Sequence, residues 1–275
     1  MNVDLHCHST ASDGLLKPAE LVARAAANGV DMLALTDHDD TAGLAVAGVE
    51  AAARGIRFID GVEISVSWQG TTIHVIGLQI DPGNARLQDG LAAVRASRAL
   101  RAVRIGEALE QAGIRGSLAG AMAYVEDPST IGRTHFARFL VDIGRAPDVK
   151  SVFRRYLVKG TPGYVTHQWA TLGDAVGWIR ASGGIAVLAH PGRYKVEGAE
   201  RRALLAEFKE CGGAAIEVVT GSHTPAQYRE FTQLAREFGL LASRGSDFHG
   251  DAGSRADLGV LPSLSADLQP VWRDW

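Results

Sequence analysis

Short apolar runs alternate with stretches of helical period along most of the chain. Val3, Leu5 and Cys7 alternate with polar residues, which is the period of a half-buried strand. Further strands are expected at the short apolar runs 32–36, 57–60, 71–77, 184–189, 214–219 and 240–243. Helices are expected between them, at residues 15–28, 41–54, 174–181, 200–210 and 225–238. Repeated strand–helix units predict an α/β fold with a parallel sheet, either doubly wound or closed into a barrel.

The alternation stops between residues 84 and 160. Residues 84–113 form one long helical stretch whose apolar positions share a face, and Arg98 lies in the middle of that stripe. Shorter helical stretches follow, without a strand pattern of their own. We therefore expect a discontinuous barrel, residues 1–83 and 161–275, with a helical insertion at residues 84–160 that caps the site.

The composition is that of an ordinary globular protein. The 275 residues are 46% hydrophobic and 21% charged, and the net charge of -3 gives no basic field for long nucleic acid. A small anion held by local arginines is still allowed. Cys7 and Cys211 are the only cysteines, so a reducing compartment fits. No signal peptide or membrane-length apolar run is visible, and we expect a cytoplasmic protein without membrane association or an obligate protein partner.

Side chains that bind metals follow the ends of several predicted strands. His6 and His8 leave the same face of the first strand, and the turn residues after them bring Asp13 back toward that place. The later strands are followed by His38, Glu63, His74, His190, Asp247 and His249. This distribution favours a barrel with its active site at the carboxyl-terminal rim, since the ends of many strands meet there.

So many imidazoles in one place are costly to bury unless something compensates them. Six of the nine histidines belong to this set, together with three carboxylates. Divalent metal ions remove that cost, so we predict a site with two to three ions. Mixed His, Asp and Glu ligands suit Mn²⁺, Fe²⁺ or Zn²⁺ without deciding among them, and Mn²⁺ is the ion we expect.

Six short motifs together resemble those of the PHP (polymerase and histidinol phosphatase) family. They are His6-x-His8 with Asp13, Thr36-Asp37-His38, Gly61-Val62-Glu63, Ile73-His74, Ala189-His190-Pro191 and Ser246-Asp247-Phe248-His249. The resemblance spans residues 3–249 and is specific as a joint pattern, although each motif alone is weak. It implies a distorted seven-stranded (β/α) barrel of PHP type and a trinuclear metal site.

The resemblance also implies a distribution of ligands. One ion would be held by His6, His8, Glu63 and Asp247, and another by Asp13, His38 and His249. A further ion would be held by Glu63, His74 and a histidine of the insertion, with Glu63 bridging. We assign the insertion histidine to His135, for which a surface position is the alternative. If His135 is not a ligand, His190 is the substitute.

Neighbouring residues are expected to support these ligands. Asp37 and His38 face opposite ways on a strand, so Asp37 is expected to accept a hydrogen bond from an imidazole. Asp39 and Asp40 are expected to cap the next helix. Glu217, in an apolar strand, either supports a ligand or makes a buried polar contact.

The predicted metals indicate phosphoester hydrolysis. Closely spaced ions create a metal-bridging hydroxide and clamp the oxygens of an in-line displacement at phosphorus. We predict a metal-dependent phosphatase in which His190 or a metal-bound water protonates the departing oxygen. Arg133, Arg193 and His190 are expected to contact the substrate, and two phosphate-binding arginines indicate a second phosphate. Arg98 is a third candidate, for which a snorkelling side chain is the favoured alternative.

Two stretches, residues 131–138 and 189–193, resemble one bacterial branch of the family. The resemblance implies removal of the 3′-phosphate from nucleoside 3′,5′-bisphosphates, such as adenosine 3′,5′-bisphosphate, and in some members trimming of short 5′-phosphorylated oligoribonucleotides. Histidinol-phosphate phosphatase is the closest alternative, and a non-catalytic PHP scaffolding module would lack ligands. An amidohydrolase would need a bridging lysine, and no lysine ends a predicted strand.

Overall fold

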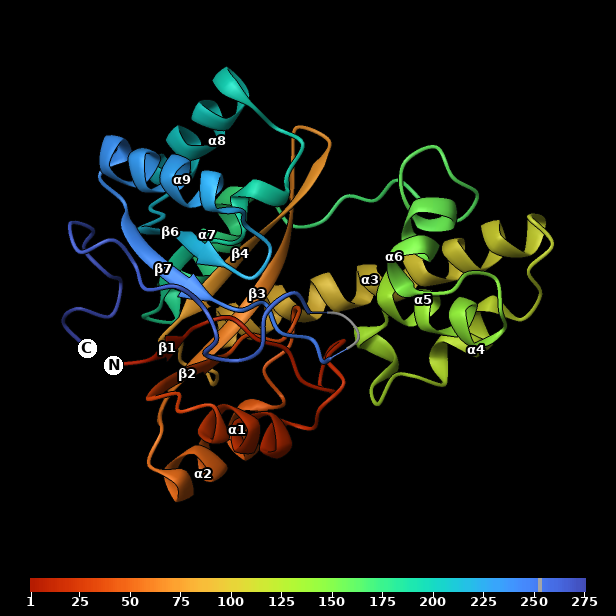
Figure 1. Cartoon of the computed structure of the whole chain (residues 1–275). Coiled ribbons are helices and arrows are strands. Elements are labelled where there is room, and N and C mark those ends of the chain that lie inside the picture. The colour runs from red at the N-terminus through yellow and green to blue at the C-terminus, as the bar shows by residue number, and fades with distance from the viewer. Residues whose placement is uncertain (252–253) are drawn as a thin grey trace.

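One sheet closes into a barrel in the computed structural model, which describes residues 1–251 and 254–275. Its seven strands follow their order in the sequence (Figure 1). They are β1 (Val3–Asp4), β2 (Met32–Leu35), β3 (Arg57–Trp68), β4 (Thr71–Leu78), β5 (Ile185–Leu188), β6 (Ala215–Thr220) and β7 (Leu241–Gly245). The barrel closes because Leu5 N donates to Arg244 O over 3.0 Å and Asp247 N donates to His6 O over 2.8 Å. The predicted fold class is confirmed.

Alternate residues of the strands serve two hydrophobic cores. In β2, Leu33 and Leu35 face the surrounding helices, while Met32 and Ala34 face the barrel interior. The covering helices are α1 (Pro18–Ala27), α2 (Leu44–Arg54), α7 (Leu172–Ala181), α8 (Gly198–Glu210) and α9 (Pro225–Phe238). Near the carboxyl terminus, Val271 packs against the interior core.

The orientation of β4 differs from the parallel sheet that the alternation predicted. β4 runs antiparallel to both β3 and β5. Trp68 of β3 pairs with Thr71 of β4, and the turn between them has positive φ at Gln69 (45°) and Gly70 (76°), as in a two-residue hairpin. A parallel return would need a crossover of a dozen or more residues, for which two residues leave no room.

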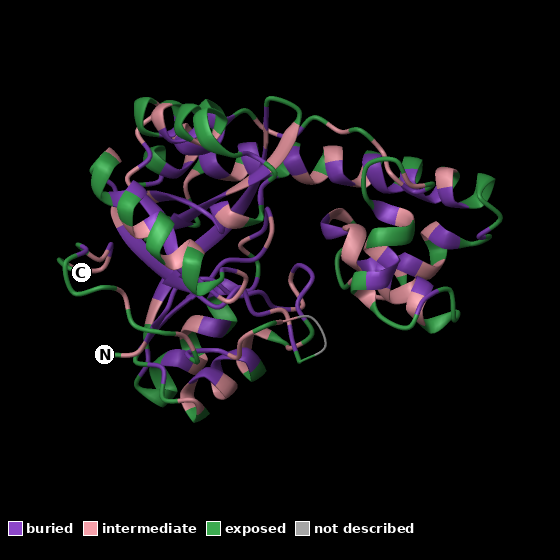
Figure 2. Cartoon of the chain, turned by 45° about the horizontal axis from the view of Figure 1, so that its top comes forward, coloured by how far each residue is buried: buried purple, intermediate pink, exposed green. Residues whose placement is uncertain are grey.

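A helical lobe stands beside the barrel, connected to it by one long helix and by the segment after residue 157 that leads back to the barrel (Figures 1 and 2). That helix is α3 (Ala85–Gln111), which packs Leu87 and Leu91 into the barrel's outer core and Ile105 and Leu109 into a second core. The other elements are α4 (Ser117–Met122), η1 (Pro128–Thr130), α5 (Arg133–Asp142), α6 (Val149–Val152) and the π-helical turn η2 (Phe153–Leu157). We call residues 102–157 the helical lobe.

The helical character expected between residues 84 and 160 is present, and α4 is an additional helix that the pattern did not predict. The proposed boundaries of the insertion stay a prediction. Within the described part of the chain, no helix joins sufficient length to sufficient apolar character for a membrane crossing.

Candidate metal centre

The carboxylate of Glu63 lies at the centre of the barrel mouth and is fully buried. Five imidazoles surround it: His190 at 2.9 Å, His74 at 3.0 Å and His6 at 3.4 Å from Oε1, and His38 at 2.9 Å and His8 at 3.4 Å from Oε2. Burial alone would raise the pKa of Glu63, but these imidazoles hold it well below its ordinary value. A carboxylate so placed is ionised and faces nitrogen atoms on several sides.

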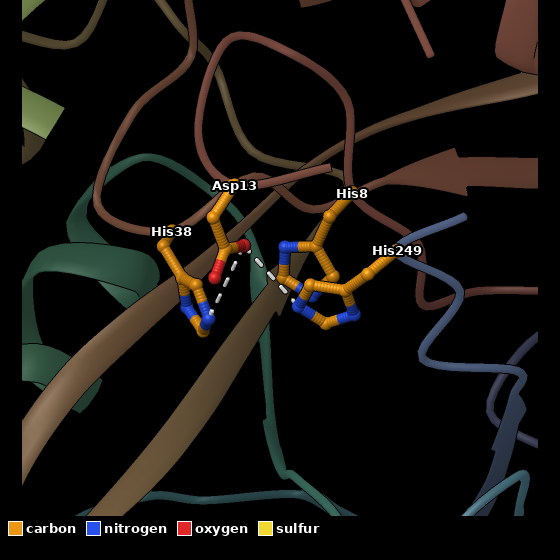
Figure 3. Close-up of side chains that lie close together, drawn as sticks. All are labelled: His8, Asp13, His38 and His249. Atoms are coloured by element: carbon orange, nitrogen blue, oxygen red, sulfur yellow. Dashed lines mark ion pairs between the residues drawn. The ribbon is translucent and has the colours of Figure 1, made fainter. Parts of the chain in front are cut away.

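Four groups of side chains bring their ligand atoms within 4.8 Å of one another. The groups are His6–His190–Asp247, His6–His8–Glu63, His38–Glu63–His74 and His8–Asp13–His38–His249. Figure 3 shows the last group, in which Asp13 Oδ1 lies 3.2 Å from His249 Nε2 and 3.9 Å from His38 Nε2. Every predicted ligand except His135 belongs to one of these groups.

The donor set fits bound divalent metal ions. Asp13 Oδ1, Glu63 Oε2 and Asp247 Oδ1 are buried, and no hydrogen bond within the described residues reaches them. Buried polar atoms are almost always satisfied, so oxygen atoms without a protein partner beside imidazole nitrogens fit the role of cation ligands. A mixed nitrogen and oxygen set of this kind suits Mn²⁺, Fe²⁺ and Zn²⁺ alike.

Unusual backbone conformations aim two of these side chains into the mouth. His190, just after β5, has a φ of 24°, and Asp247, just after β7, has a φ of 56°. Residues other than glycine rarely adopt such values, and they occur where the surrounding structure enforces them, often at functional sites. Gly245 allows the close approach of β7 to β1, because a Cβ atom there would lie 2.3 Å from the Cβ of His6.

Glu217 supports two of the clustered histidines. Its Oε1 accepts a hydrogen bond from His6 Nδ1 over 3.0 Å, and its Oε2 accepts one from the backbone N–H of His190 over 2.6 Å. The first bond fixes the tautomer of His6 and leaves Nε2 free to face the cluster. Of the two alternatives for Glu217, the structure shows the first: Glu217 supports His6, one of the clustered histidines.

The hydrogen bond predicted between Asp37 and an imidazole is wrong. The Asp37 carboxylate accepts instead from the backbone N–H of Ser9 (2.8 Å), the hydroxyl of Ser9 (2.6 Å) and the hydroxyl of Ser12 (2.6 Å). The turn after β1 folds over the end of β2, and its hydroxyl groups satisfy the buried carboxylate. Asp37 therefore fixes the turn that carries Asp13.

Asp39 does not cap the next helix as predicted, since α2 begins after Gly43. Asp39 has a φ of 55°, which turns its side chain inward, where it accepts hydrogen bonds from the N–H (2.7 Å) and hydroxyl (2.9 Å) of Ser65. It also forms a buried ion pair with Arg98. Arg98 is therefore neither a free phosphate ligand nor a snorkelling side chain, the two alternatives that the sequence left open for it.

His135 is buried in the first turn of α5, outside the four groups. Its Nδ1 accepts a hydrogen bond from the backbone N–H of Gly132 over 3.0 Å, and burial lowers its pKa to about 4. His190 places its Nε2 atom 2.9 Å from Glu63 Oε1, and it forms a group with His6 and Asp247, whereas His38 is the histidine grouped with Glu63 and His74. The structure thus brings the substitute, His190, to Glu63.

The two predicted phosphate-binding arginines lie on different sides of the lobe–barrel junction. Arg193 places Nη1 at 2.6 Å from Asp247 Oδ2 and has a side chain that is half exposed. Arg133 begins α5, where its guanidinium lies 5.5 Å from the centroid of the Phe153 ring and 3.5 Å from the Leu157 carbonyl oxygen. Burial and the nearby Arg98 and Arg193 lower the pKa of Arg133.

A cavity of about 760 Å³ opens between the barrel mouth and the helical lobe. Its volume is sufficient for a nucleotide-sized ligand. The barrel contributes Arg193, Asp247 and His249 to its wall, and the lobe contributes Thr134, Arg138 and Phe153. Clustered side chains are therefore accessible from this cavity.

Comparisons with known proteins agree with this geometry. A model of the PHP domain matches residues 4–130. A 3′,5′-nucleoside bisphosphate phosphatase from Chromobacterium violaceum is 50% identical over 273 residues, which cover 99% of this chain and 96% of that protein. The chain belongs to the PHP family. The 5′-3′ exoribonuclease Rnm of Escherichia coli is 43% identical to this PHP protein over 274 residues, 99% of this chain and 93% of that one.

A solved structure of the same fold extends the comparison over the whole PHP protein. It is described as an amidohydrolase from Chromobacterium violaceum with bound sulfate and no metal. It is 50% identical, with a TM-score of 0.96, and the match covers 100% of this chain and 95% of that one. The predicted family, barrel fold and class of phosphoester hydrolase are confirmed by these relatives.

Sequence reasoning missed two residues of the helical lobe that contact the clustered side chains of this PHP protein. Thr134 donates a hydrogen bond from its hydroxyl to Asp13 Oδ2 over 2.7 Å, and Arg138 donates to the backbone carbonyl of Asp13. Both lie beside His135 in the stretch that carried the resemblance. Their position one turn apart on α5 was the available signal, because it places them on one face.

Proposed function

We propose that the chain removes the 3′-phosphate from nucleoside 3′,5′-bisphosphates, for example converting adenosine 3′,5′-bisphosphate to AMP and phosphate. The observation that carries this proposal is the buried Glu63 carboxylate among five imidazoles, beside a nucleotide-sized cavity bordered by arginines. The bisphosphate phosphatase of Chromobacterium violaceum, similar over almost its whole length, supports the choice of substrate.

We assign the metal ligands from the four groups at the barrel mouth. They are His6, His8, Asp13, His38, Glu63, His74, His190, Asp247 and His249. Two to three divalent ions held there would neutralise the charge of the phosphate and activate water for attack at phosphorus. Mn²⁺ is the ion we expect, and a cytoplasmic location also stays a prediction.

The chain's own residues bind and orient the substrate in this proposal. Arg193 is half exposed in the cavity wall beside Asp247, so its guanidinium can fork onto the phosphate that is cleaved. Burial lowers the pKa of His190 to about 3, and its Nε2 faces Glu63. Because its Nε2 lies among the ligand atoms of the cluster, we propose that His190 holds a metal ion, and that a metal-bound water protonates the departing oxygen.

The same chemistry accounts for both activities named among the relatives. Removing a 3′-phosphate and releasing the first nucleotide of a 5′-phosphorylated RNA both break the bond between phosphorus and the 3′-oxygen of the 5′-terminal nucleotide. The departing group is the same nucleoside 5′-phosphate in both cases, and the substrates differ only in what stays attached to phosphorus: oxygen alone, or the 5′-oxygen of the next nucleotide. A cavity of about 760 Å³ leaves space there for further nucleotides, so we also propose activity on short oligoribonucleotides.

The alternatives fit the described structure less well. Histidinol phosphate carries positive charge, which Arg133 and Arg193 near the mouth would repel. A scaffolding module that has lost its site would lack ligands, yet four groups are complete. A carbamylated bridging lysine has no candidate, because all five lysines are exposed: Lys17, Lys150, Lys159, Lys195 and Lys209.

The test is phosphate release with Mn²⁺ supplied, from adenosine 3′,5′-bisphosphate, AMP and histidinol phosphate. We expect release from the bisphosphate, and at least a hundredfold lower kcat for Glu63→Gln, since that variant removes the shared carboxylate. Glu107→Gln, an exposed change on α3, serves as the matched control. A preference for histidinol phosphate, or no release from any of the three, would contradict the proposal.

A further inference from the structure

Two buried arginines interrupt the apolar face of α3 where this helix passes from the barrel to the helical lobe. Arg98 and Arg101 are 7% and 8% exposed, and they continue the buried stripe between Val94 and Ile105. Both guanidinium groups lie over the ring of Trp169, at 4.9 Å and 5.2 Å from its centroid. At the junction between barrel and lobe, the buried face of α3 therefore carries two cations in place of apolar side chains.

The two arginines differ in their partners. Arg98 forms an ion pair with Asp39 and a hydrogen bond to the hydroxyl of Ser65 (3.0 Å), although its buried Nε atom has no partner among the described residues. Arg101 has a buried Nε atom without a partner, and its guanidinium forms no ion pair with any residue in the described ranges. Burial and the neighbouring Arg133 and Arg98 lower its pKa to about 9. A buried cation without an anion is unfavourable for folding, so its presence needs another explanation.

The charge of Arg133 acts on Arg101, and Arg133 also has no carboxylate partner in the part of the chain that the structure describes. Its contacts are the Leu157 carbonyl oxygen and the ring of Phe153. Within the set Arg98, Arg101 and Arg133, one carboxylate, Asp39, faces three cations. Two positive charges are left uncompensated, which matches the charge of a phosphate monoester dianion.

The set is connected directly to the proposed metal ligands. Arg98 pairs with Asp39, which follows His38 in the chain, and Gly132 next to Arg133 lies against the guanidinium of Arg98. A phosphate at Arg101 and Arg133 would therefore lie beside the cluster but outside it. That separation suits a substrate with two phosphates, one cleaved and one held.

We propose that Arg101 and Arg133 together bind the phosphate that is not cleaved, the 5′-phosphate of the substrate. Planar guanidinium groups bind phosphate oxygens in pairs, and desolvation strengthens each contact. This inference rests on the proposed function. It assigns to Arg101 the recognition of substrates that carry a 5′-phosphate. Arg193, which is paired with Asp247, would contact the phosphate that is cleaved.

Two substrates with the same scissile ester test the assignment. Adenosine 3′,5′-bisphosphate carries the 5′-phosphate and adenosine 3′-monophosphate lacks it. We expect Arg101→Gln to lower kcat/KM at least tenfold for the bisphosphate and less than twofold for the monophosphate, with most of the change in KM. Arg86→Gln, an exposed change in the first turn of α3, should leave both values unchanged. Arg101→Lys should restore part of the preference.

A second measurement separates binding from folding and from turnover. In the presence of a chelator, inorganic phosphate should raise the Tm of the wild-type protein and leave the Tm of Arg101→Gln unchanged. Without phosphate, the Tm of the variant should be at least that of the wild type. The assignment would be overturned if Arg101→Gln lost kcat/KM equally on both substrates and had a lower Tm. It would also be overturned if phosphate still raised the Tm of the variant, or if the wild type had no preference for the bisphosphate. If the wild type cleaves neither substrate, the proposed function fails, and the phosphate shift still decides whether Arg101 binds the anion.

Discussion

Thr134 of the helical lobe donates a hydrogen bond from its hydroxyl to Oδ2 of Asp13, a clustered carboxylate of the barrel, over 2.7 Å. Asp13 Oδ1 is left facing His249 at 3.2 Å. The two oxygens of one carboxylate therefore have different partners, the lobe on one side and the imidazole cluster on the other. Hydrogen bonds to a metal-binding carboxylate fix its orientation, so the lobe would help to orient Asp13 in the proposed metal centre.

Replacing Thr134 by valine keeps the shape of the side chain and removes this hydrogen bond. We expect binding of Mn²⁺ to weaken about tenfold, the lower end of the effect of such outer contacts. Competition with a fluorescent chelator measures the affinity. Thr232→Val on α9, away from the mouth, is the matched control, and equal affinity of both variants would show that Thr134 does not orient Asp13.

Glu217→Gln tests the support beneath His6. The amide keeps the size of the side chain but loses the charge that holds His6 Nδ1–H and receives the backbone N–H of His190. We expect Mn²⁺ affinity to fall by about ten- to a hundredfold, with a parallel fall in kcat/KM. The exposed Glu237→Gln should change neither quantity. An unaltered metal affinity in Glu217→Gln would remove this role.

The pH dependence of metal binding follows from His249. Burial acts to lower its pKa, but the nearby carboxylate of Asp13 raises it to about 9. The imidazole is therefore protonated at neutral pH without metal, and a metal ion must displace that proton. Affinity for Mn²⁺ should rise as pH increases from 6 to 8, by up to about tenfold per pH unit.

Calorimetry of Mn²⁺ binding in buffers of different ionisation enthalpy measures the proton released. His249→Asn should bind with less proton release and a shallower pH slope than the wild type. The same slope and the same proton release in both proteins would assign the titration to another group.

The Asp39–Arg98 ion pair is expected to hold α3 against the barrel. Arg98→Met leaves the Asp39 carboxylate buried without its cation, and breaking one side of such a pair costs about 3–5 kcal/mol of unfolding free energy. Urea denaturation measures the change. The double variant Asp39→Asn/Arg98→Met should be more stable than Arg98→Met alone, because no buried charge is left; simple addition of the two single effects would contradict the pairing.

Much of the site could be predicted from local sequence, because its chemistry follows from spacing along strands. His6 and His8 share a face by the two-residue period of a strand, and the positions after later strands converge in a barrel. The direction of β4 could not be obtained in this way. The run at residues 57–60 continues through Val62, Ile64 and Val66, and that extension brings the strand end to within two residues of β4.

Contacts between distant segments explain the remaining differences. The partners of Asp37 and Asp39, the turn at Ser9 and the guanidinium of Arg98, depend on how the first turn and α3 pack on the barrel. The position of His190 beside Glu63 depends on its backbone, whose φ of 24° is a tertiary constraint with no local sequence signal.

The continuous course of α3 through two hydrophobic cores has a consequence for protein engineering. Because α3 contributes side chains to both cores, neither the barrel nor the helical lobe can be exchanged between relatives by cutting within this helix. A chimera that is to inherit another member's substrate preference must receive α3 together with the helical lobe. The fusion point then lies before residue 85, where α3 begins.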